Sequence, residues 1–429
     1  MILIDTALQK RETENNPIKV AIIGAGIMGQ GIINQICRYS PGIEIVVVYN
    51  RTLSKAENAI KTLGIENYAI AESNTEYKRA RDLGKMVLTQ NIDVLCEGFD
   101  VDVVVEVTGT IEFATRTILK AFENGKHVLS FNAEIEATIG PILKYKAEKF
   151  GERYTLAEGD QPGVTMNLFR QVKSMGFKPL LCGNIKGLQD RYRNPTTQKS
   201  FAAQWNMTPQ MVTSFADGTK ISVEQACIAN ATGMKVAKRG MLGYYTDKHV
   251  DEIKGLYDID QMKELGGIVE YVVGAKPGPG VYIYATIDDS FSKKYLKYVK
   301  MGEGPLYSFY IPYHLLFFEI ANSISRLVDF KDDVLSAKNG LVVDVVTTAK
   351  IDLKKGDTID GQGGYKSYGL CENYSISKKE NLLPVGIAEG CILVNDVAKD
   401  QVISYNDIIL PDGRLVDIFK KEQNELIFE

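Results

Sequence analysis

The chain has 429 residues, more than one ordinary hydrophobic core accommodates, so two or three domains are expected. A charged fraction of 24% and a net charge of −4 give no reason to expect nucleic acid or an anionic membrane as a partner. The sequence predicts no signal peptide, and no stretch approaches the ~20 apolar residues of a membrane span. The six cysteines are scattered without a Cys-x-x-Cys pair, which indicates reduced thiols in a cytoplasmic protein.

The strongest motif is Gly24-x-Gly26-x-x-Gly29, which lies between an apolar run at 20–23 and a helical pattern. Gly24 permits a tight turn, Gly26 lets the backbone approach a pyrophosphate, and Gly29 lets the helix lie close to its strand. The helix N-terminus then faces the phosphate charge. The motif predicts dinucleotide binding, with a structural turn or a mononucleotide site as the alternative. The loop would contact the cofactor through Gly24, Gly26, Ile27, Met28 and Gly29.

The residues after the second predicted strand, at 43–49, indicate which cofactor is bound. An NAD site usually has Asp or Glu there to hold the ribose 2′-hydroxyl, whereas an NADP site often offers Arg. This chain has Asn50, Arg51 and Thr52 and no carboxylate. Arg51 is expected to stack on adenine and pair with a 2′-phosphate, which Asn50 and Thr52 can also hydrogen-bond. We therefore expect NADP, with NAD as the alternative. If Arg51 is only a solvated loop charge, it has no role in cofactor binding.

Further apolar strands alternate with helical patterns up to about residue 157, which predicts a doubly wound parallel α/β sheet of the Rossmann kind. Ligands of such sheets lie beyond the carboxyl ends of the strands. Polar or flexible residues follow several predicted strand ends. We expect Thr108, Gly109 and Asn132 to contact the cofactor, and Glu134 and Asp160 to contact the substrate. Any one of them alone would read as a turn or a helix cap.

The alternation becomes irregular after Gly163, which favours an α+β substrate domain. A strand is expected at 178–185 and a longer helix from about Ile221. An apolar helix ending near Leu327 is expected to pack on this domain. The last hundred residues predict a small β-rich module without a catalytic constellation. The predicted division is a lead at 1–17, a cofactor domain at 18–158, a catalytic domain at 159–330 and the β-rich domain at 331–429.

These stretches resemble a family of NAD(P)-dependent oxidoreductases that have a homoserine-dehydrogenase-like Rossmann domain and end in a SAF domain. The family includes the type II, DXR-like form of 1-deoxy-D-xylulose 5-phosphate reductoisomerase. The resemblance implies an oxidoreductase acting on a small hydroxylated, phosphorylated ketone or aldehyde, with a homo-oligomeric assembly. It rests on 24–31, 106–110, 132–134, 159–163, 217–220, 230–233, 312–315, 353–359 and 396–403. The Asn50-Arg51-Thr52 ending is compatible with a branch distinct from the reductoisomerase itself.

Carbonyl reduction also needs an acid that protonates the nascent alkoxide. Lys220, near a helix start, is the first candidate, and Lys186, at a strand end, is the partner for phosphate or for the carbonyl oxygen. Each is otherwise a surface lysine. The acidic candidates are Glu134, Asp160, Asp217 and Glu224, which bind substrate hydroxyls or hold Mg²⁺ or Mn²⁺. The three histidines lack zinc-ligand spacing.

Two other functions remain open at this stage. One is a homoserine-type dehydrogenase that catalyses no carbon rearrangement. The other is a nucleotide-binding redox sensor that has lost turnover. The carboxylates and lysines at successive strand ends argue against the sensor.

Overall fold

A computed structural model describes residues 2–426, which divide into two compact units. Unit 1 comprises the chain up to Asp160 together with Leu315–Ser336 and Ile418–Gln423. Unit 2 comprises Gln161–His314, Ala337–Asp417 and the described residues from Asn424. Each unit is described by itself.

Unit 1 is built on a seven-stranded sheet in the order β3-β4-β2-β1-β5-β6-β7, and every neighbouring pair is parallel. The strand order reverses between β1 and β5, so the predicted doubly wound sheet is confirmed. Its central strands are buried apolar runs, as a sheet covered on both faces requires. The strands are β1 (Ile18–Ile23), β2 (Ile43–Tyr49), β3 (Tyr68–Ile70), β4 (Met86–Thr89), β5 (Val103–Glu106), β6 (His127–Ser130) and β7 (Tyr154–Leu156).

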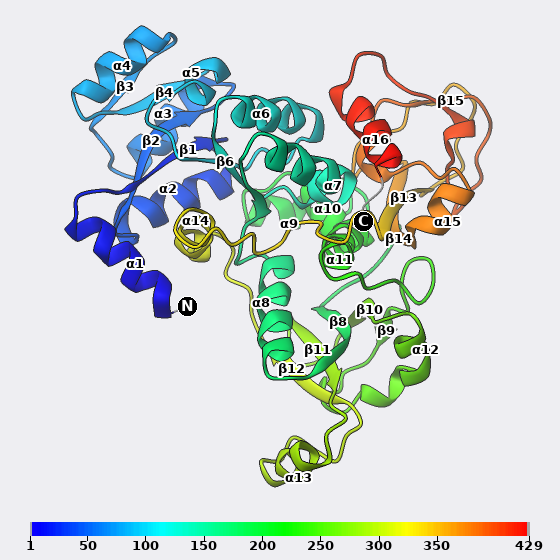
Figure 1. Ribbon diagram of the computed structural model, residues 1–429. Helices are drawn as coiled ribbons and strands as arrows, with labels where there is room; N and C mark the ends of the chain where they lie inside the picture. Colours follow the sequence, from blue (N-terminus) through cyan, green and yellow to red (C-terminus); the bar gives the residue numbers. More distant parts are fainter. Residues whose placement is uncertain (1, 427–429) are drawn as a thin grey trace. The chain divides into compact units, whose positions relative to one another are not determined.

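Seven helices of unit 1 precede or connect these strands (Figure 1). The first helix lies within the predicted lead at 1–17, and its Ile4 and Leu8 pack into the core of the unit. The helices are α1 (Ile2–Thr13), α2 (Ile27–Tyr39), α3 (Leu53–Thr62), α4 (Asn74–Asp82), α5 (Ile92–Cys96), α6 (Ile111–Glu123) and α7 (Ala133–Lys149).

The apolar helix after His314 does not pack on the middle of the chain as expected. It forms α14 (Ile320–Val328), preceded by the 3₁₀ turn η2 (Leu316–Glu319), and belongs to unit 1. Ile320, Ile324 and Leu327 recur at helical spacing and are fully buried in the same core as β1 and β6. The expectation was wrong because the apolar stripe is visible in the sequence but its partner sheet is not.

Helix α7 is kinked at Ile139, just before Pro141. A proline inside a helix removes a backbone hydrogen bond and disturbs the preceding turn. Helix α16 (Leu415–Glu425) supplies the missing partners from far along the chain. The Gln423 side chain accepts a hydrogen bond from the backbone N–H of Ile142 at 3.2 Å and donates one to the carbonyl oxygen of Thr138 at 3.1 Å.

Unit 2 contains a mixed sheet in the order β12-β11-β8-β10-β9. Strand β8 lies at its centre, parallel to β10 and antiparallel to β11. The strand expected at 178–185 and the helix expected from about Ile221 are present as β8 and α11. The strands are β8 (Lys178–Lys186), β9 (Tyr244–Tyr245), β10 (Ile268–Val273), β11 (Gly280–Thr286) and β12 (Tyr307–Ile311). The helices are α8 (Gln161–Ser174), α9 (Lys199–Gln204), α10 (Pro209–Asp217), α11 (Thr219–Thr232), η1 (Lys254–Leu256), α12 (Ile259–Glu264) and α13 (Ser290–Tyr298).

The predicted C-terminal β-rich module is present, and it packs on α11 within unit 2 (Figure 1). The backbone N–H of Gly369 donates to the Thr219 hydroxyl at 2.9 Å, and the Ser222 hydroxyl donates to the carbonyl oxygen of Gly369 at 3.1 Å. The module thereby anchors the helix that carries two candidate catalytic residues. Its elements are β13 (Val343–Ala349), β14 (Ser367–Asn373), α15 (Tyr374–Lys379), η3 (Val385–Ile387), β15 (Ile392–Leu393), η4 (Tyr405–Asp407) and β16 (Ile408–Ile409).

Over residues 2–426, none of the helices combines the length and the apolar character that crossing a membrane requires. The cysteines are free thiols, of which Cys37 is exposed and the other five are buried.

Candidate functional site

The glycine motif forms the turn between β1 and α2. Gly24 has φ of +113°, a left-handed conformation that side chains rarely adopt. A Cβ on Gly29 would lie 2.0 Å from the carbonyl oxygen of Gly24, so only glycine fits between helix and turn. A Cβ on Gly26 would meet nothing within 4 Å. The space outside Gly26 and the N-terminus of α2, which no side chain caps, therefore fit the pyrophosphate of a dinucleotide.

The residues after β2 divide into one that holds the turn and two that face solvent. The Asn50 side chain accepts a hydrogen bond from the backbone N–H of Ala25 at 3.2 Å and donates one to the carbonyl oxygen of Thr52 at 2.7 Å. Asn50 thus ties the glycine turn to the end of β2. Arg51 and Thr52 are exposed beside it. Their place at the end of β2 is the one from which a ribose 2′-substituent is recognised.

A buried carboxylate, to which sequence reasoning assigned no role, organises the ends of β5 and β6. Glu106 accepts hydrogen bonds from the Thr108 backbone N–H at 2.7 Å and from the Ser130 hydroxyl at 3.2 Å. Burial raises the pKa of Glu106, and the hydrogen bonds from these donors oppose that rise. The network fixes the loop that contains Thr108 and Gly109. A glutamate at the end of an otherwise apolar strand was the available signal.

Asn132 serves as the N-cap of α7, where its side chain accepts from the backbone N–H of Ile135 at 3.1 Å. Its amide also donates to the carbonyl oxygen of Thr110 at 3.3 Å, which joins the loops after β5 and β6. Glu134 lies half-buried in the first turn of α7, and Asp160 lies half-buried four residues after Leu156, where β7 ends. Asn132, Glu134 and Asp160 all lie in unit 1 at the carboxyl edge of its sheet.

Unit 2 brings together a second cluster, at the carboxyl end of β8. The Asn184 amide donates to the Gln161 side chain and to the Glu224 carboxylate, the latter at 3.4 Å. Lys186 follows two residues later, and its Nζ donates to the carbonyl oxygen of Phe215 at 2.8 Å. Burial lowers the pKa of Lys186, while the charges of Glu224 and Asp217 oppose that fall. The structure thus places predicted Lys186 and Glu224 together with two residues that the sequence did not single out.

Asp217 is committed to an ion pair within this unit. It is fully buried, and the Lys350 Nζ donates to its Oδ2 at 2.9 Å. Lys350, which follows β13, also donates to the carbonyl oxygens of Arg193 and Gly364. The same carboxylate accepts from the Thr219 backbone N–H at 2.9 Å, next to half-buried Lys220 at the start of α11. Asp217 therefore joins the C-terminal module to the turn that carries Lys220.

The part of the chain that the structure describes holds no ready-made metal site. Among residues 2–426, no three His, Cys, Asp or Glu side chains are grouped so that they could hold a metal ion. The Nδ1 of His127 lies 2.6 Å from a Glu152 carboxylate oxygen, which gives this histidine a structural partner. The Nδ1 of His249 accepts a hydrogen bond from the backbone N–H of Asp251 at 3.2 Å.

Two family matches cover most of the first three quarters of the chain. Residues 24–157 match the NAD-binding domain of homoserine dehydrogenase. Residues 159–320 match the catalytic domain of oxidoreductase DRL. The boundary between them falls at the end of the parallel sheet of unit 1.

Homoserine dehydrogenases are among the similar proteins, each matched over about a third of this chain. The enzyme of Pseudomonas aeruginosa is 32% identical over 136 residues, which cover 32% of this chain and 27% of that protein. The enzyme of Bacillus subtilis is 28% identical over 134 residues, 31% of this chain and 28% of that protein. The match thus spans about a quarter of these relatives' length. Among solved structures, a homoserine dehydrogenase from Thiobacillus denitrificans aligns with a TM-score of 0.45 at 14% identity, over 90% of this chain and 97% of that chain.

Proposed function

We propose that this chain, which joins an NAD-binding domain of the homoserine dehydrogenase kind to a DRL-type oxidoreductase catalytic domain, is an NADP-dependent reductase of a small carbonyl compound. The substrate class is a hydroxylated, phosphorylated ketone or aldehyde, as the resemblance in the sequence implies. The observation that carries the proposal is a half-buried lysine, Lys186, at the end of a central strand, beside polar side chains that can bind hydroxyl groups.

The choice of NADP over NAD is supported by the end of β2. No carboxylate occupies 50–52, so no negative charge there repels a 2′-phosphate. Asn50 is engaged by the glycine turn, which leaves Arg51 as the cation for that phosphate and Thr52 as a neutral donor. Gly26 and the N-terminus of α2 would hold the pyrophosphate.

A bound nicotinamide coenzyme supplies the hydride, which adds to the carbonyl carbon while the carbonyl oxygen takes up a proton. Lys186 is the favoured proton donor, because a lysine whose pKa is lowered by burial gives up its proton more readily near neutrality. Its hydrogen bond to Phe215 fixes the ammonium group at the strand end. Lys220 lies next to the Asp217 ion pair and is proposed to offset the substrate's negative charge.

The polar residues beside Lys186 are proposed to orient the substrate. Asn184 and Gln161 bind each other, and Glu224 accepts from Asn184, so the three present a connected set of donors and acceptors. Such a set suits a polyol, in which each hydroxyl both donates and accepts. Glu134 and Asp160, which belong to unit 1, stay predictions as contacts for substrate hydroxyls.

A second candidate function is a homoserine-type dehydrogenase, which the match of residues 24–157 favours.

In the leading function, a carbon rearrangement before reduction would be assisted by Mg²⁺ or Mn²⁺, which chelates adjacent oxygens of the substrate. By the same resemblance we expect a cytoplasmic homo-oligomer.

NADPH oxidation by the full chain distinguishes these functions. Pentulose phosphates and aspartate semialdehyde are supplied in turn, each with and without Mg²⁺. We expect turnover with a phosphorylated ketone or aldehyde. Turnover with aspartate semialdehyde alone would establish the homoserine type, and tight NADPH binding without any turnover would establish the sensor. A preference for NADH would contradict the proposed role of Arg51.

A further inference from the structure

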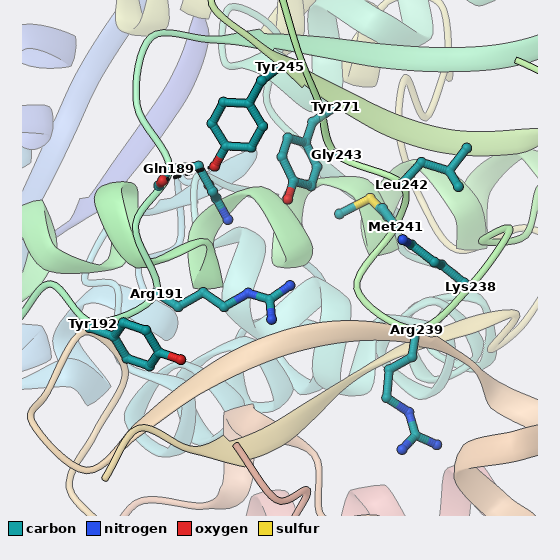
Figure 2. Close-up of a pocket in the computed structure, with 10 residues that line it drawn as sticks. All are labelled: Gln189, Arg191, Tyr192, Lys238, Arg239, Met241, Leu242, Gly243, Tyr245 and Tyr271. Carbon is teal, nitrogen blue, oxygen red and sulfur yellow. Dashed lines mark hydrogen bonds between the residues drawn. The ribbon is translucent and has the colours of Figure 1, made fainter. Parts of the chain in front are cut away.

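A cavity of about 440 Å³ lies in unit 2 (Figure 2), and its lining residues differ from those of the Lys186 cluster. Its walls come from the segment after β8, from the loop before β9, and from β9 and β10. None of the residues assigned above to carbonyl reduction lines it. The lining residues are Gln189, Arg191, Tyr192, Lys238, Arg239, Met241, Leu242, Gly243, Tyr245 and Tyr271.

Three of the lining side chains are cationic, and two of them lack a carboxylate partner. Figure 2 shows Arg191 and Lys238 entering the cavity from opposite sides. Within residues 2–426 neither forms an ion pair, although the Arg191 guanidinium lies 5.9 Å from the centre of the Tyr368 ring. Arg239 differs, because its Nε and Nη2 lie 2.6 and 2.5 Å from Glu372 and Glu380. Among the described residues, Arg191 and Lys238 therefore stand in the cavity without an ion pair, in a chain with a net charge of −4.

A buried carboxylate, Glu270, is hydrogen-bonded to the backbone of the segment that lines the cavity. Glu270 accepts hydrogen bonds from the backbone N–H groups of Leu242 and Gly243 at 2.6 and 3.0 Å. Burial raises its pKa to about 7, which weakens its negative charge near neutrality. Glu270 is thus held by the backbone of the lining residues Leu242 and Gly243, and the charge of Lys238 opposes the rise in its pKa.

Neutral donors complete the lining. Burial and the neighbouring Glu270 raise the pKa of Tyr271 to about 12, so its hydroxyl keeps its proton. That hydroxyl points into the cavity in Figure 2. The Tyr245 hydroxyl donates to the carbonyl oxygen of Gln189 at 3.1 Å, which holds one wall in place. Met241 and Leu242 provide apolar surface on the other side.

We propose that this cavity is a binding site for a small oxyanionic ligand, one bearing a phosphate or a carboxylate group. Arg191 and Lys238 supply two cations from opposite walls, and the Tyr271 hydroxyl supplies a neutral donor. Such charge-assisted hydrogen bonds are the strong ones, and the guanidinium fork matches an oxyanion in a bidentate way. Oxyanion binding in this cavity does not depend on the proposed reaction, whereas assigning the oxyanion to the substrate rests on the proposed function.

Two kinds of oxyanion would fit the same donor groups of the cavity. The oxyanion is either the terminal group of the substrate or a separate molecule that regulates the enzyme. Inorganic phosphate distinguishes them in steady-state kinetics. Competition with the substrate indicates the first source, and inhibition or activation without competition indicates the second.

The site itself is tested by titrating the full chain with inorganic phosphate in a calorimeter at low ionic strength. The double variant Arg191→Gln, Lys238→Gln is compared with a control that loses the same charges elsewhere, Arg79→Gln, Lys248→Gln. Both control residues are exposed and lie outside the cavity. We expect the Kd for phosphate to rise at least about tenfold in the first variant, since two charge-assisted contacts are lost. The control should stay within about twofold of the parent protein.

Phosphate that binds at the glycine turn contributes equally to both variants, so their difference reports the cavity alone. Equal phosphate affinity in the two double variants would overturn the inference. If the Arg191 and Lys238 double variant loses its cooperative melting transition, Lys238→Gln alone serves as the second measurement, because Lys238 is exposed. An unchanged phosphate affinity in that single variant would also overturn it.

Discussion

Substituting Gly26 with Ala should separate coenzyme binding from folding. A Cβ at this position meets nothing within 4 Å, and the φ of −73° is one that alanine adopts freely. Alanine restricts the unfolded backbone more than glycine does, which stabilises the folded protein by about 0.4–1 kcal/mol. Loss of the glycine N-cap of α2 destabilises it by about the same amount. The free energy of unfolding should therefore change by less than about 1 kcal/mol. The new methyl group fills the space expected for the pyrophosphate, so the Kd for NADPH should rise at least about tenfold, or ~1.4 kcal/mol.

The assay pairs urea unfolding with NADPH fluorescence titration. Gly255→Ala is the matched control, because a Cβ there also meets nothing within 4 Å. Gly29→Ala is the contrasting variant. Its Cβ would lie 2.0 Å from the carbonyl oxygen of Gly24, so folding itself should lose about 1–3 kcal/mol. If Gly26→Ala binds NADPH as tightly as the Gly255→Ala control does, the coenzyme does not approach Gly26 and the reasoning fails.

Three further predictions follow from the sites and the core. Arg51→Asp should move the ratio of kcat/KM values from NADPH toward NADH, and an unchanged ratio would remove Arg51 from the site. Since burial lowers the pKa of Lys186, the rate of carbonyl reduction should fall as pH rises through a value below the ordinary 10.5 of lysine. Lys186→Arg should shift this falling limb of the pH–rate profile to higher pH, while the control Lys178→Arg should leave it in place. If the limb falls at the same pH in both variants, Lys186 is not the acid. Gln423→Leu should lower the free energy of unfolding by about 1–3 kcal/mol, because the N–H of Ile142 loses its partner; exposed Lys421→Leu is the control, and an equal change in both would refute the role of Gln423.

The sequence alone determined the parallel sheet and its cofactor turn, because both depend on local patterns. The spacing of Gly24, Gly26 and Gly29 and the apolar runs of β1 and β5 follow from constraints within about ten residues. The same holds for the polar residues after strand ends, since parallel strands deliver their carboxyl ends to one edge. Lys186 was singled out in this way, at the end of an expected strand.

Only the tertiary structure decided which distant groups meet. Lys350 reaches buried Asp217 from 133 positions away, Gln423 completes the kinked α7, and α14 joins the core of unit 1. The cavity lined by Arg191 and Lys238 likewise depends on three separate segments. The hydrophobicity or charge of a residue indicates that it must be buried or paired. Which residue becomes its partner depends on the chain topology and on packing across the whole unit.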